Sequence, residues 1–370
     1  MTSSQAPRRV ALIVSSLRSG GVERMRLTLA RGFLARGVAV DLVVVDARGD
    51  LRPAVPAGVR LVDLGKAHMR SAWWSLVAYL RRERPDAVLT AQTHLNLVVL
   101  AACACIRSRP RVVVSEHIDL SAVLAQDASW KIRLYPLGVR LMYPLADSVV
   151  AVSGATARGF ARATGFPESR VGVIYNPVIT PDLPSLAAAP AEHAWFADPT
   201  VPVILSVGRL TKQKDYGTLL RAFAQVRRTR RARLVILGDG SERAHLERLA
   251  AELGISDDVA LPGFTPNPFA SMARARVFVV SSRWEGCPNV LVEAMGCGTP
   301  VVSTDCPSGP HEVLERGVHG PLTPVGDADA MAAAIAAALE HPVAPEQLVR
   351  RAQHFSEERA VEAYLQLLLP

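Results

Sequence analysis

The sequence predicts an α/β protein made of two successive Rossmann-like domains, each built on a parallel sheet. The chain has 370 residues, which is too long for one ordinary core and suits two domains of about 150 to 200 residues. Short β-branched runs alternate with longer stretches of helical periodicity, the pattern of parallel sheets with helices on both faces. A segment rich in Pro, Ala, Asp and Ser interrupts this alternation between residues 180 and 199. We therefore expect a domain on each side of that segment.

The β-branched runs locate the strands of the two expected sheets. In the first half they predict strands at residues 10–15, 38–46, 87–90, 111–115, 148–153 and 171–175. In the second half they predict strands at residues 203–207, 234–237, 259–261, 277–280 and 301–303. Helical spacing predicts the intervening helices, for example at residues 22–35 and 71–84. The expected boundaries are a first domain at 1–177, a linker at 178–200, a second domain at 201–345, and C-terminal helices at 346–370 that can pack back toward the first domain.

Composition excludes several classes of protein. An apolar content of 49% and a charged content of 21% are those of a packed globular chain rather than a disordered one. No apolar run approaches the roughly 20 residues of a membrane-spanning helix, and the run behind Arg8 and Arg9 is too short for a signal peptide. Five cysteines without a C-x-x-C pair favour reduced thiols over disulfides or a zinc cage. We expect a cytoplasmic protein without a strong metal site.

The net charge of +8 is unevenly distributed. Residues 1–176 hold 24 Lys and Arg against 12 Asp and Glu, whereas the remaining residues hold 18 against 22. A basic first half favours an anionic partner such as a membrane surface, a phosphorylated lipid or a nucleic acid. No recognition motif accompanies the basic residues, so a nucleic acid is not expected. In the alternative interpretation, the excess of Lys and Arg in the first half reflects an Arg-rich composition whose charges lie on solvated helix faces.

The segment at residues 281–300, SSRWEGCPNVLVEAMGCGTP, carries the clearest functional signal. It follows the strand expected at 277–280, turns through a glycine and a proline, and enters a helix at about Asn289, a good N-cap residue. In open parallel sheets, ligands bind beyond the carboxyl ends of the strands. The free amides and the positive dipole end of a helix start suit a diphosphate.

Two carboxylates flank that helix start. Glu285 lies before the helix and Glu293 one turn into it, so they can meet different parts of one elongated ligand. A carboxylate accepts two hydrogen bonds and suits the vicinal hydroxyls of a sugar or a ribose. In the alternative interpretation, Glu285 merely ends a turn and Glu293 pairs with a distant arginine.

The E-x7-E spacing, the continuation EAMGCGTPVV and the tail STDCPSGPHE resemble retaining glycosyltransferase family 4, and the resemblance spans nearly the whole chain. It implies the GT-B fold, in which two Rossmann-like domains face a central cleft. It also implies that Glu285 holds hydroxyls of the transferred sugar and that Glu293 holds the ribose of the nucleotide. The phosphates would be held by backbone from Gly286 to Val290, which includes Cys287 and Asn289.

The same resemblance bears on the donor. Related enzymes with a T-D-C-P-S-G-P tail often use UDP-linked galactose, N-acetylgalactosamine, glucose or N-acetylglucosamine. They commonly carry an arginine where this chain has His311, so the identity of the sugar stays open. The family generally needs no metal for catalysis, and no other cofactor is implied.

A second basic segment follows the first strand of the second half. A turn separates Arg209 from Lys214 and can bring both cations onto one diphosphate, where they would offset the negative charge of the leaving group. The diphosphate-binding Arg and Lys of the family match these two positions. Without the two glutamates, the segment would be interpreted as a solvated basic turn.

Two features of the first half are expected to complete the site. Gly20 and Gly21 precede a helix and permit close backbone approach, and the family has a similar G-G-x-E-R loop near the donor phosphates and acceptor. A glycine turn needed only for packing is the alternative. His117 follows the strand at 111–115 and matches the family's first-domain histidine, which lies near the reacting sugar. It could orient a sugar hydroxyl rather than remove a proton.

Two other patterns have simpler interpretations. Gly238 and Gly240 begin like a dinucleotide fingerprint, but Arg243 stands where a third glycine belongs, so an NAD oxidoreductase is not favoured. The family uses this loop beside the nucleotide base. Asp327 and Asp329 resemble a metal-binding pair, yet they precede an Ala-rich helix and are expected to cap it.

These observations predict a transferase that moves a hexosyl or N-acetylhexosaminyl group from a UDP-sugar to a hydroxyl acceptor with retention. The expected acceptor is a lipid-linked saccharide or another cell-envelope glycan precursor, bound by the first domain. A basic and aromatic stretch with leucines between its members is compatible with an interfacial helix on an anionic membrane, at the inner face of the plasma membrane; it contains Lys131, Arg133, Tyr135, Arg140 and Tyr143. A sugar-nucleotide epimerase of similar shape and a non-catalytic sugar-nucleotide-binding protein remain as alternatives.

Overall fold

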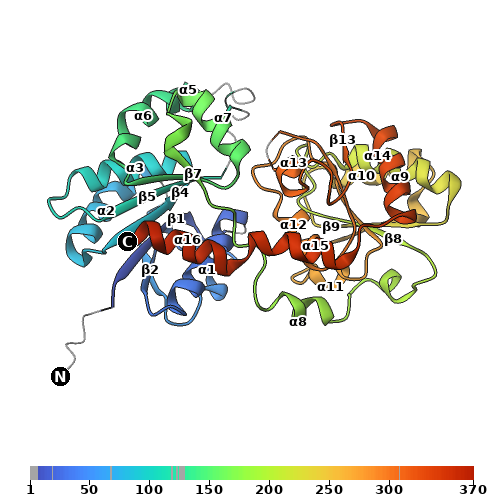
Figure 1. Ribbon diagram of the computed structural model, residues 1–370, viewed down its shortest axis with the longest axis horizontal. Helices are drawn as coiled ribbons and strands as arrows, with labels where there is room; N and C mark the ends of the chain where they lie inside the picture. The colour runs from blue at the N-terminus through green and yellow to red at the C-terminus, as the bar shows by residue number, and fades with distance from the viewer. Residues whose placement is uncertain are drawn as a thin grey trace. The chain divides into compact units, whose positions relative to one another are not determined.

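The computed structural model of the chain describes residues 7–18, 20–66, 69–117, 120–121, 124, 130–307 and 309–370. The chain divides into two compact units (Figure 1). The first unit contains residues 1–177 together with 356–370, and the second contains residues 178–355. Each unit is a parallel sheet with helices on both faces, as the alternating sequence pattern predicts.

The sheet of the first unit has seven strands in the order β3-β2-β1-β4-β5-β6-β7. The strands are β1 (Arg9–Ser16), β2 (Ala39–Asp46), β3 (Arg60–Asp63), β4 (Ala87–Ala91), β5 (Arg111–Glu116), β6 (Ser148–Ala151) and β7 (Val171–Val173). Alternate residues of β1 enter two different cores, because successive side chains of a strand point to opposite faces. Ala11 and Ile13 join one core, and Val10, Leu12 and Val14 join the other.

Helices cover both faces of this first sheet. They are α1 (Gly21–Leu34), α2 (Met69–Glu83), α3 (Thr93–Ala104), α5 (Trp130–Arg133), α6 (Tyr135–Met142), α7 (Gly154–Thr164) and α16 (Glu357–Leu368). The core that contains Leu12 also contains Phe33 of α1 and Tyr364 of α16. The opposite core contains Leu80 of α2 and Phe160 of α7. The C-terminal helix α16 is therefore a structural part of the first unit.

The sheet of the second unit has six strands in the order β10-β9-β8-β11-β12-β13. They are β8 (Val203–Val207), β9 (Arg233–Leu237), β10 (Val259–Gly263), β11 (Val277–Val280), β12 (Val301–Thr304) and β13 (Leu322–Thr323). The helices are α8 (Leu183–Ala188), α9 (Tyr216–Thr229), α10 (Arg243–Glu252), α11 (Phe269–Met272), α12 (Asn289–Gly296), α13 (Pro310–Val313), α14 (Ala328–Glu340) and α15 (Pro345–Ala352). The central neighbours β8 and β11 pair in parallel, so the loops that follow them lie side by side.

The expected linker at 178–200 is packed into the second unit. Val178, Ile179 and Leu183 are buried, and a Cβ added to Gly296 of α12 would lie 2.5 Å from Ile179 Cδ1. The expected C-terminal segment 346–370 is divided, because most of α15 packs on α12 in the second unit while α16 joins the first. The Pro- and Ala-rich composition of this segment predicted a linker because it lacks regular periodicity. Its apolar residues are nevertheless buried in the second unit.

Two further observations concern the start of α14 and the length of the helices. Asp327 caps α14, since its side chain accepts a 2.9 Å hydrogen bond from the Ala330 amide, which confirms the capping interpretation. Within the described ranges, no helix has both the length and the apolar character needed to cross a bilayer.

Candidate active site

An ion pair joins the loops that follow β8 and β11. Lys214 Nζ lies 2.5 Å from Glu285 Oε1, and Ser282 Oγ donates a 2.6 Å hydrogen bond to the same oxygen. Glu285 is only 8% exposed. The sequence brings these residues together because β8 and β11 are neighbours, and each loop begins where its strand ends.

Several hydrogen bonds fix the two loops to each other. The Arg283 amide donates to Gln213 O at 2.8 Å, and Gln213 Nε2 donates to Trp284 O at 2.9 Å. Ser281 Oγ donates to Lys214 O at 2.7 Å. The Lys214 and Glu285 side chains are therefore held by a rigid frame before any ligand binds.

Glu285 has one occupied and one available oxygen. Oε1 receives both Lys214 and Ser282, whereas no partner of Oε2 is found among the described residues. An ionised carboxylate oxygen accepts hydrogen bonds from hydroxyl groups. The geometry thus presents a fixed acceptor beside a fixed cation.

The tail at residues 303–312 packs onto the loop that carries Glu285. Thr304 Oγ1 donates to Ser282 O at 2.6 Å, and a Cβ at Gly309 would lie 2.4 Å from Pro288 Cδ. Gly309 also has a φ of +108°, so it is required both for its backbone conformation and for this close approach. Ser308 lies outside the described residues. His311 Nδ1 lies 3.3 Å from Asp305 Oδ1 within the same tail.

The start of α12 differs in detail from the expectation. Asn289 is the first helical residue, and Pro288 occupies the N-cap position without a side-chain cap. Proline suits a helix start because it lacks an amide donor and has a fixed φ. Gly286, Cys287 and Val290 are partly exposed residues beside this start, and Glu293 lies one turn further along α12 and is also partly exposed.

The loops that follow β8 and β9 lie next to the loop that carries Glu285. They contain Arg209 and the two glycines at 238 and 240. Arg209 is exposed, and its guanidinium makes no hydrogen bond or ion pair with any described residue. A Cβ at Gly238 would lie 2.1 Å from Gly208 O, and one at Gly240 would lie 2.3 Å from Leu210 O. The absence of a side chain at both positions is therefore explained by contact between two loops, independently of a bound phosphate.

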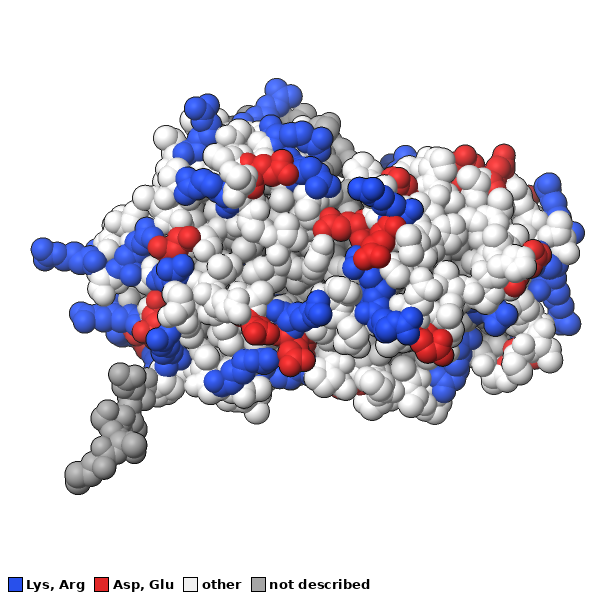
Figure 2. Space-filling model, in the orientation of Figure 1, with Lys and Arg blue, Asp and Glu red and all other residues white. Residues whose placement is uncertain are grey.

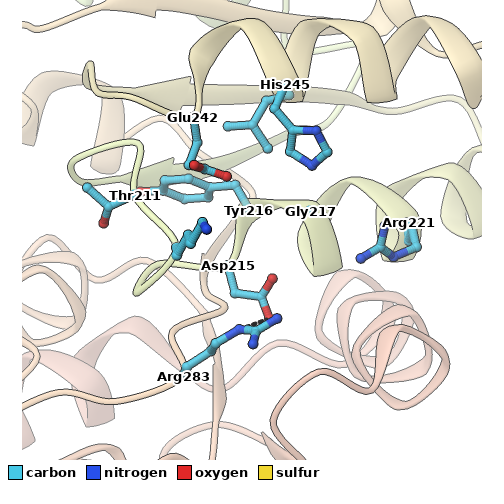
Figure 3. A pocket seen from close by; sticks show the side chains of 10 residues that line it. Thr211, Asp215, Tyr216, Gly217, Arg221, Glu242, His245 and Arg283 are labelled. Atoms are coloured by element: carbon cyan, nitrogen blue, oxygen red, sulfur yellow. Dashed lines mark hydrogen bonds and ion pairs between the residues drawn. The ribbon is translucent and has the colours of Figure 1, made fainter. Parts of the chain in front are cut away.

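Two pockets open at the same strand ends, and sequence reasoning did not identify either. One has a volume of about 230 Å³ and is lined by ionisable side chains that include Lys212, Arg221, Glu242, His245 and Arg283. Figure 3 shows Arg283 facing Asp215, to which its Nε donates at 3.1 Å. The other pocket has a volume of about 90 Å³ and is lined by His193, Leu237, Phe264 and Thr265, among others. Phe264 is 67% exposed, so its ring is accessible beside this pocket.

His117, Gly20 and Gly21 belong to the first unit. His117 follows β5 and is 9% exposed, with Nε2 lying 3.1 Å from Ser115 Oγ and 3.5 Å from Arg26 Nη2. Burial, reinforced by the charge of Arg26, holds the pKa of His117 well below its usual range, so the imidazole is neutral at neutral pH. Arg26 is a neighbour of His117 that sequence reasoning missed.

Gly20 occupies the N-cap position of α1, and Gly21 is the first residue of that helix. A Cβ at Gly20 would lie 2.2 Å from Glu23 Oε2, so the glycine leaves room for the Glu23 carboxylate to fold over the helix start. Ser19 lies outside the described residues.

Comparison with known proteins identifies the two halves of the chain separately. Residues 19–180 match the model of "Glycosyltransferase Family 4", and residues 191–355 match the model of "Glycosyl transferases group 1". Lipopolysaccharide core biosynthesis glycosyltransferase LpsD of Rhizobium meliloti is 32% identical over 359 residues, which cover 94% of each chain.

Other relatives are matched over part of their length. An N-acetylgalactosamine-N,N'-diacetylbacillosaminyl-diphospho-undecaprenol 4-alpha-N-acetylgalactosaminyltransferase of Campylobacter jejuni is 33% identical over 193 residues, which cover 52% of this chain and 51% of that protein. The chain likewise spans 61% and 49% of the lengths of two further curated glycosyltransferases.

A solved structure shares the fold over the whole chain. HepE of Anabaena in complex with UDP superimposes with a TM-score of 0.79 at 22% sequence identity, covering 98% of this chain and 99% of that chain. At this level of identity the likeness establishes the GT-B fold, while the assignment to a family rests on the sequence matches.

Proposed function

We propose that this chain, which belongs to the glycosyltransferases of family 4 and group 1, transfers a hexosyl or N-acetylhexosaminyl group from a UDP-sugar to a hydroxyl acceptor. The anomeric configuration of the sugar would be retained in the product. The observation that carries the proposal is the contact between Lys214 and Glu285 at the ends of two neighbouring strands. It places a cation suited to a diphosphate beside a carboxylate suited to a sugar hydroxyl.

In the proposed reaction, Glu285 binds hydroxyls of the transferred sugar through Oε2, while Lys214 and Ser282 hold Oε1. Lys214 and the exposed guanidinium of Arg209 offset the negative charge that develops on UDP as the glycosidic bond breaks. The acceptor attacks from the leaving-group face, and its proton passes to the donor phosphate. Because these cations stabilise the leaving group, the proposal includes no metal.

The nucleotide would extend along the strand ends of the second unit. Glu293 on α12 would accept hydrogen bonds from the ribose hydroxyls. The small pocket beside Phe264 and His193 offers aromatic surface against which a uracil ring can stack. UDP is supported as the nucleotide by the solved relatives that contain UDP or UDP-glucose.

The proposed acceptor is a lipid-linked saccharide or another envelope glycan precursor. Support comes from relatives whose names specify lipopolysaccharide core synthesis and a diphospho-undecaprenol substrate. The first unit also carries an exposed apolar stripe on consecutive turns around α6, formed by Leu134, Leu137 and Leu141, which are 50%, 57% and 66% exposed. Basic side chains surround the region of α5 and α6 in Figure 2. An apolar stripe with flanking Arg133 and Arg140 suits an anionic membrane surface, although the side chain of Lys131 lies outside the described residues.

The alternatives make different predictions for the same assay. An epimerase would convert one UDP-sugar into another without releasing UDP, and a non-catalytic binding protein would bind UDP-sugars without turnover. The relatives named above are glycosyltransferases, which favours transfer.

The experiment measures UDP release against acceptor consumption, using UDP-galactose, UDP-glucose and their N-acetylated forms with a polyprenyl-diphosphate-linked saccharide. Lys214→Ala is expected to lower the transfer rate by about 100-fold or more, as for loss of one group that stabilises a developing charge. Glu285→Gln is expected to lower kcat/KM by about 10- to 100-fold, because a charged hydrogen bond to the sugar is weakened. The anomeric coupling constant of the product tests retention.

Arg228→Ala is the matched control, since Arg228 is an exposed cation on α9 of the same unit and lines neither pocket. It should keep near-normal transfer. Thermal unfolding of each variant is measured alongside, because removing Lys214 leaves a buried carboxylate without its cation. Near-normal transfer by both folded Lys214→Ala and folded Glu285→Gln would contradict the assignment.

A further inference from the structure

Arg26 is a buried cation in the first unit. It lies on α1 and is 1% exposed, whereas its neighbour Arg24 is exposed. A buried charge is costly unless it is paired or hydrogen-bonded, and arginine keeps its charge in proteins. Arg26 has no carboxylate in direct contact among the described residues, so its burial calls for another reason.

The contacts of Arg26 converge on the end of β5. Its Nη2 donates to Ser115 Oγ, donates to Thr90 O at 3.3 Å, and lies 3.5 Å from His117 Nε2. On its other side the guanidinium lies 5.9 Å from the centre of the Tyr364 ring of α16. Arg26 therefore connects two helices to the histidine that follows β5.

The protonation of the His117 ring is not fixed by Ser115. Ser115 Oγ lies 3.1 Å from both His117 Nε2 and Thr90 O, and a hydroxyl can donate to one while accepting from the other. An N–H at Nε2 and a lone pair at Nε2 would both satisfy this serine. The charge of Arg26 removes the ambiguity, because a cation 3.5 Å away favours a lone pair and disfavours an N–H.

We propose that Arg26 is a positioning residue for glycosyl transfer, which holds His117 as the neutral tautomer with its hydrogen on Nδ1. Nδ1 of His117 then acts as a hydrogen-bond donor. It can orient a hydroxyl of the sugar by donating to it, but Nδ1 cannot accept a proton from that hydroxyl. This role rests on the proposed transferase function, whereas the tautomer itself does not depend on it.

The other titratable groups around this cluster make no hydrogen bond or ion pair with the His117 side chain among the described residues. Glu23 lies one turn earlier on α1, and burial raises its pKa. Glu116 is next to His117 in the chain, but its carboxylate is engaged by Thr93, Asn96 and Tyr143, and burial raises its pKa as well. Tyr364 acts on Arg26 itself, since its ring centre lies 5.9 Å from the guanidinium and its phenol favours the charged form of the arginine. Arg26 is therefore the charged side chain that the described residues bring against Nε2, at 3.5 Å.

The test uses long-range proton–nitrogen NMR correlations of the imidazole rings in the full-length protein labelled with ¹⁵N-histidine. The chain has nine histidines, and the signal of His117 is identified by its loss in His117→Gln. The wild-type protein is expected to show an Nδ1–H tautomer and no protonation of His117 between about pH 5.5 and pH 8, the range in which a free histidine titrates. An Nε2–H tautomer, or titration within that range, would overturn the proposal without any variant being required.

Arg26→Met and Arg26→Lys separate the charge from the fold. In Arg26→Met the pKa of His117 should move up toward its usual range and the Nε2–H form should appear, whereas Arg26→Lys should keep the wild-type signature. Arg31→Met is the matched control, because Arg31 lies on the same helix and pairs with Glu357 of α16 at 2.6 Å without contacting His117. An unchanged His117 spectrum in folded Arg26→Met would also overturn the proposal.

Transfer activity is measured separately. If Arg26→Met changes the His117 spectrum and lowers kcat, and Arg26→Lys restores both, the positioning role stands. If the wild-type protein shows the expected tautomer but transfers no sugar, the transferase proposal fails while the assignment of the tautomer survives.

Discussion

At the scale of single residues, the sequence predicted that Lys214 and Glu285 follow strands of the second sheet, but it did not predict the contacts around them. Glu285 and Lys214 were expected to contact a ligand, and the structure adds that they contact each other. Arg26 gave no signal, because an arginine on a helix with two other nearby arginines has the pattern of a solvated face. Burial of a charged residue is decided by the elements packed around it, and here those include α16, more than 300 positions away in the chain.

The glycines at 238 and 240 have a structural explanation that does not depend on a bound donor. They were expected near the donor, and the structure shows that carbonyl oxygens of the preceding loop occupy the space of their missing side chains. Both explanations are compatible, since the loop they contact also carries Arg209. Close packing of backbone atoms is a sufficient reason for glycine at each position.

Gly238→Ala should therefore destabilise the second unit even without ligand. The added Cβ would lie 2.1 Å from Gly208 O, and the φ of +139° is unfavourable for alanine. We expect the free energy of unfolding to fall by about 1 to 3 kcal/mol, measured by urea denaturation. Gly217→Ala is the control, because its Cβ would meet no atom closer than 3.5 Å and lies in the first turn of α9. Equal stability of the two variants would show that the loop yields to the added methyl group.

At the scale of elements, the long apolar strands were predictable and the short edge strands were not. All eleven strands expected from β-branched runs are present, with ends that differ by a few residues. The sequence missed β3 (Arg60–Asp63), whose side chains are partly or fully exposed, and β13 (Leu322–Thr323), which has only two residues. Such strands lack both the length and the apolar content that distinguish a strand from a loop, and they form because a neighbouring strand is available to pair with.

The helix α6 provides the element-scale prediction. Its exposed stripe of Leu137 and Leu141, continued by Leu134, should bind vesicles of phosphatidylglycerol and phosphatidylcholine at low salt. Transfer of a leucine side chain out of water contributes about 1.5 to 3 kcal/mol. Replacing Leu137 and Leu141 by Glu should therefore lower the partition coefficient by at least about ten-fold, as measured by sedimentation.

Val318→Glu is the matched control for this experiment. Val318 is 60% exposed and lies in the second unit, so its replacement introduces one glutamate in place of another exposed apolar residue, which matches the charge of Leu137→Glu alone. Its effect on sedimentation should be small. Vesicles of phosphatidylcholine alone should bind the wild-type protein less well, since Arg133 and Arg140 then lose their anionic partner. Binding that is equal for all variants would mean that α6 is not the contact surface.

At the scale of the whole molecule, the chain ends in the unit where it begins. The sequence indicated two sheets, and it allowed the last helices to return to the first domain. The structure places the return after Phe355, whose carbonyl accepts hydrogen bonds from Val178 and Ile179. The outgoing and returning segments are thus adjacent at the edge of the second unit. Periodicity alone could not locate this point, because α15 and α16 are both amphipathic and differ only in which core accepts them.

The return of the chain makes the stability of the first unit dependent on α16. Val361, Tyr364 and Leu368 are almost fully buried in the core that contains α1, and Arg111 Nε donates to Leu367 O at 2.5 Å. Deleting residues 356–370 exposes the apolar face of α1, and each large side chain lost from the core contributes about 1.5 to 3 kcal/mol. We expect amide protection in α1 and β2 to fall by at least about 100-fold in hydrogen exchange, because the opening free energy of that unit falls.

The second unit should be unaffected by the same deletion, since residues 178–355 form a continuous compact segment. Protection of β8 and α9 should therefore stay near the wild-type level. Val361→Asp in the full-length chain should reproduce the selective loss, because it places an unpaired charge where the side chain is 0% exposed. Glu358→Ala, on the exposed face of α16, should leave both units unchanged. A uniform loss of protection in both units would show that they unfold together. The units divided at Phe355 would then not be independently stable.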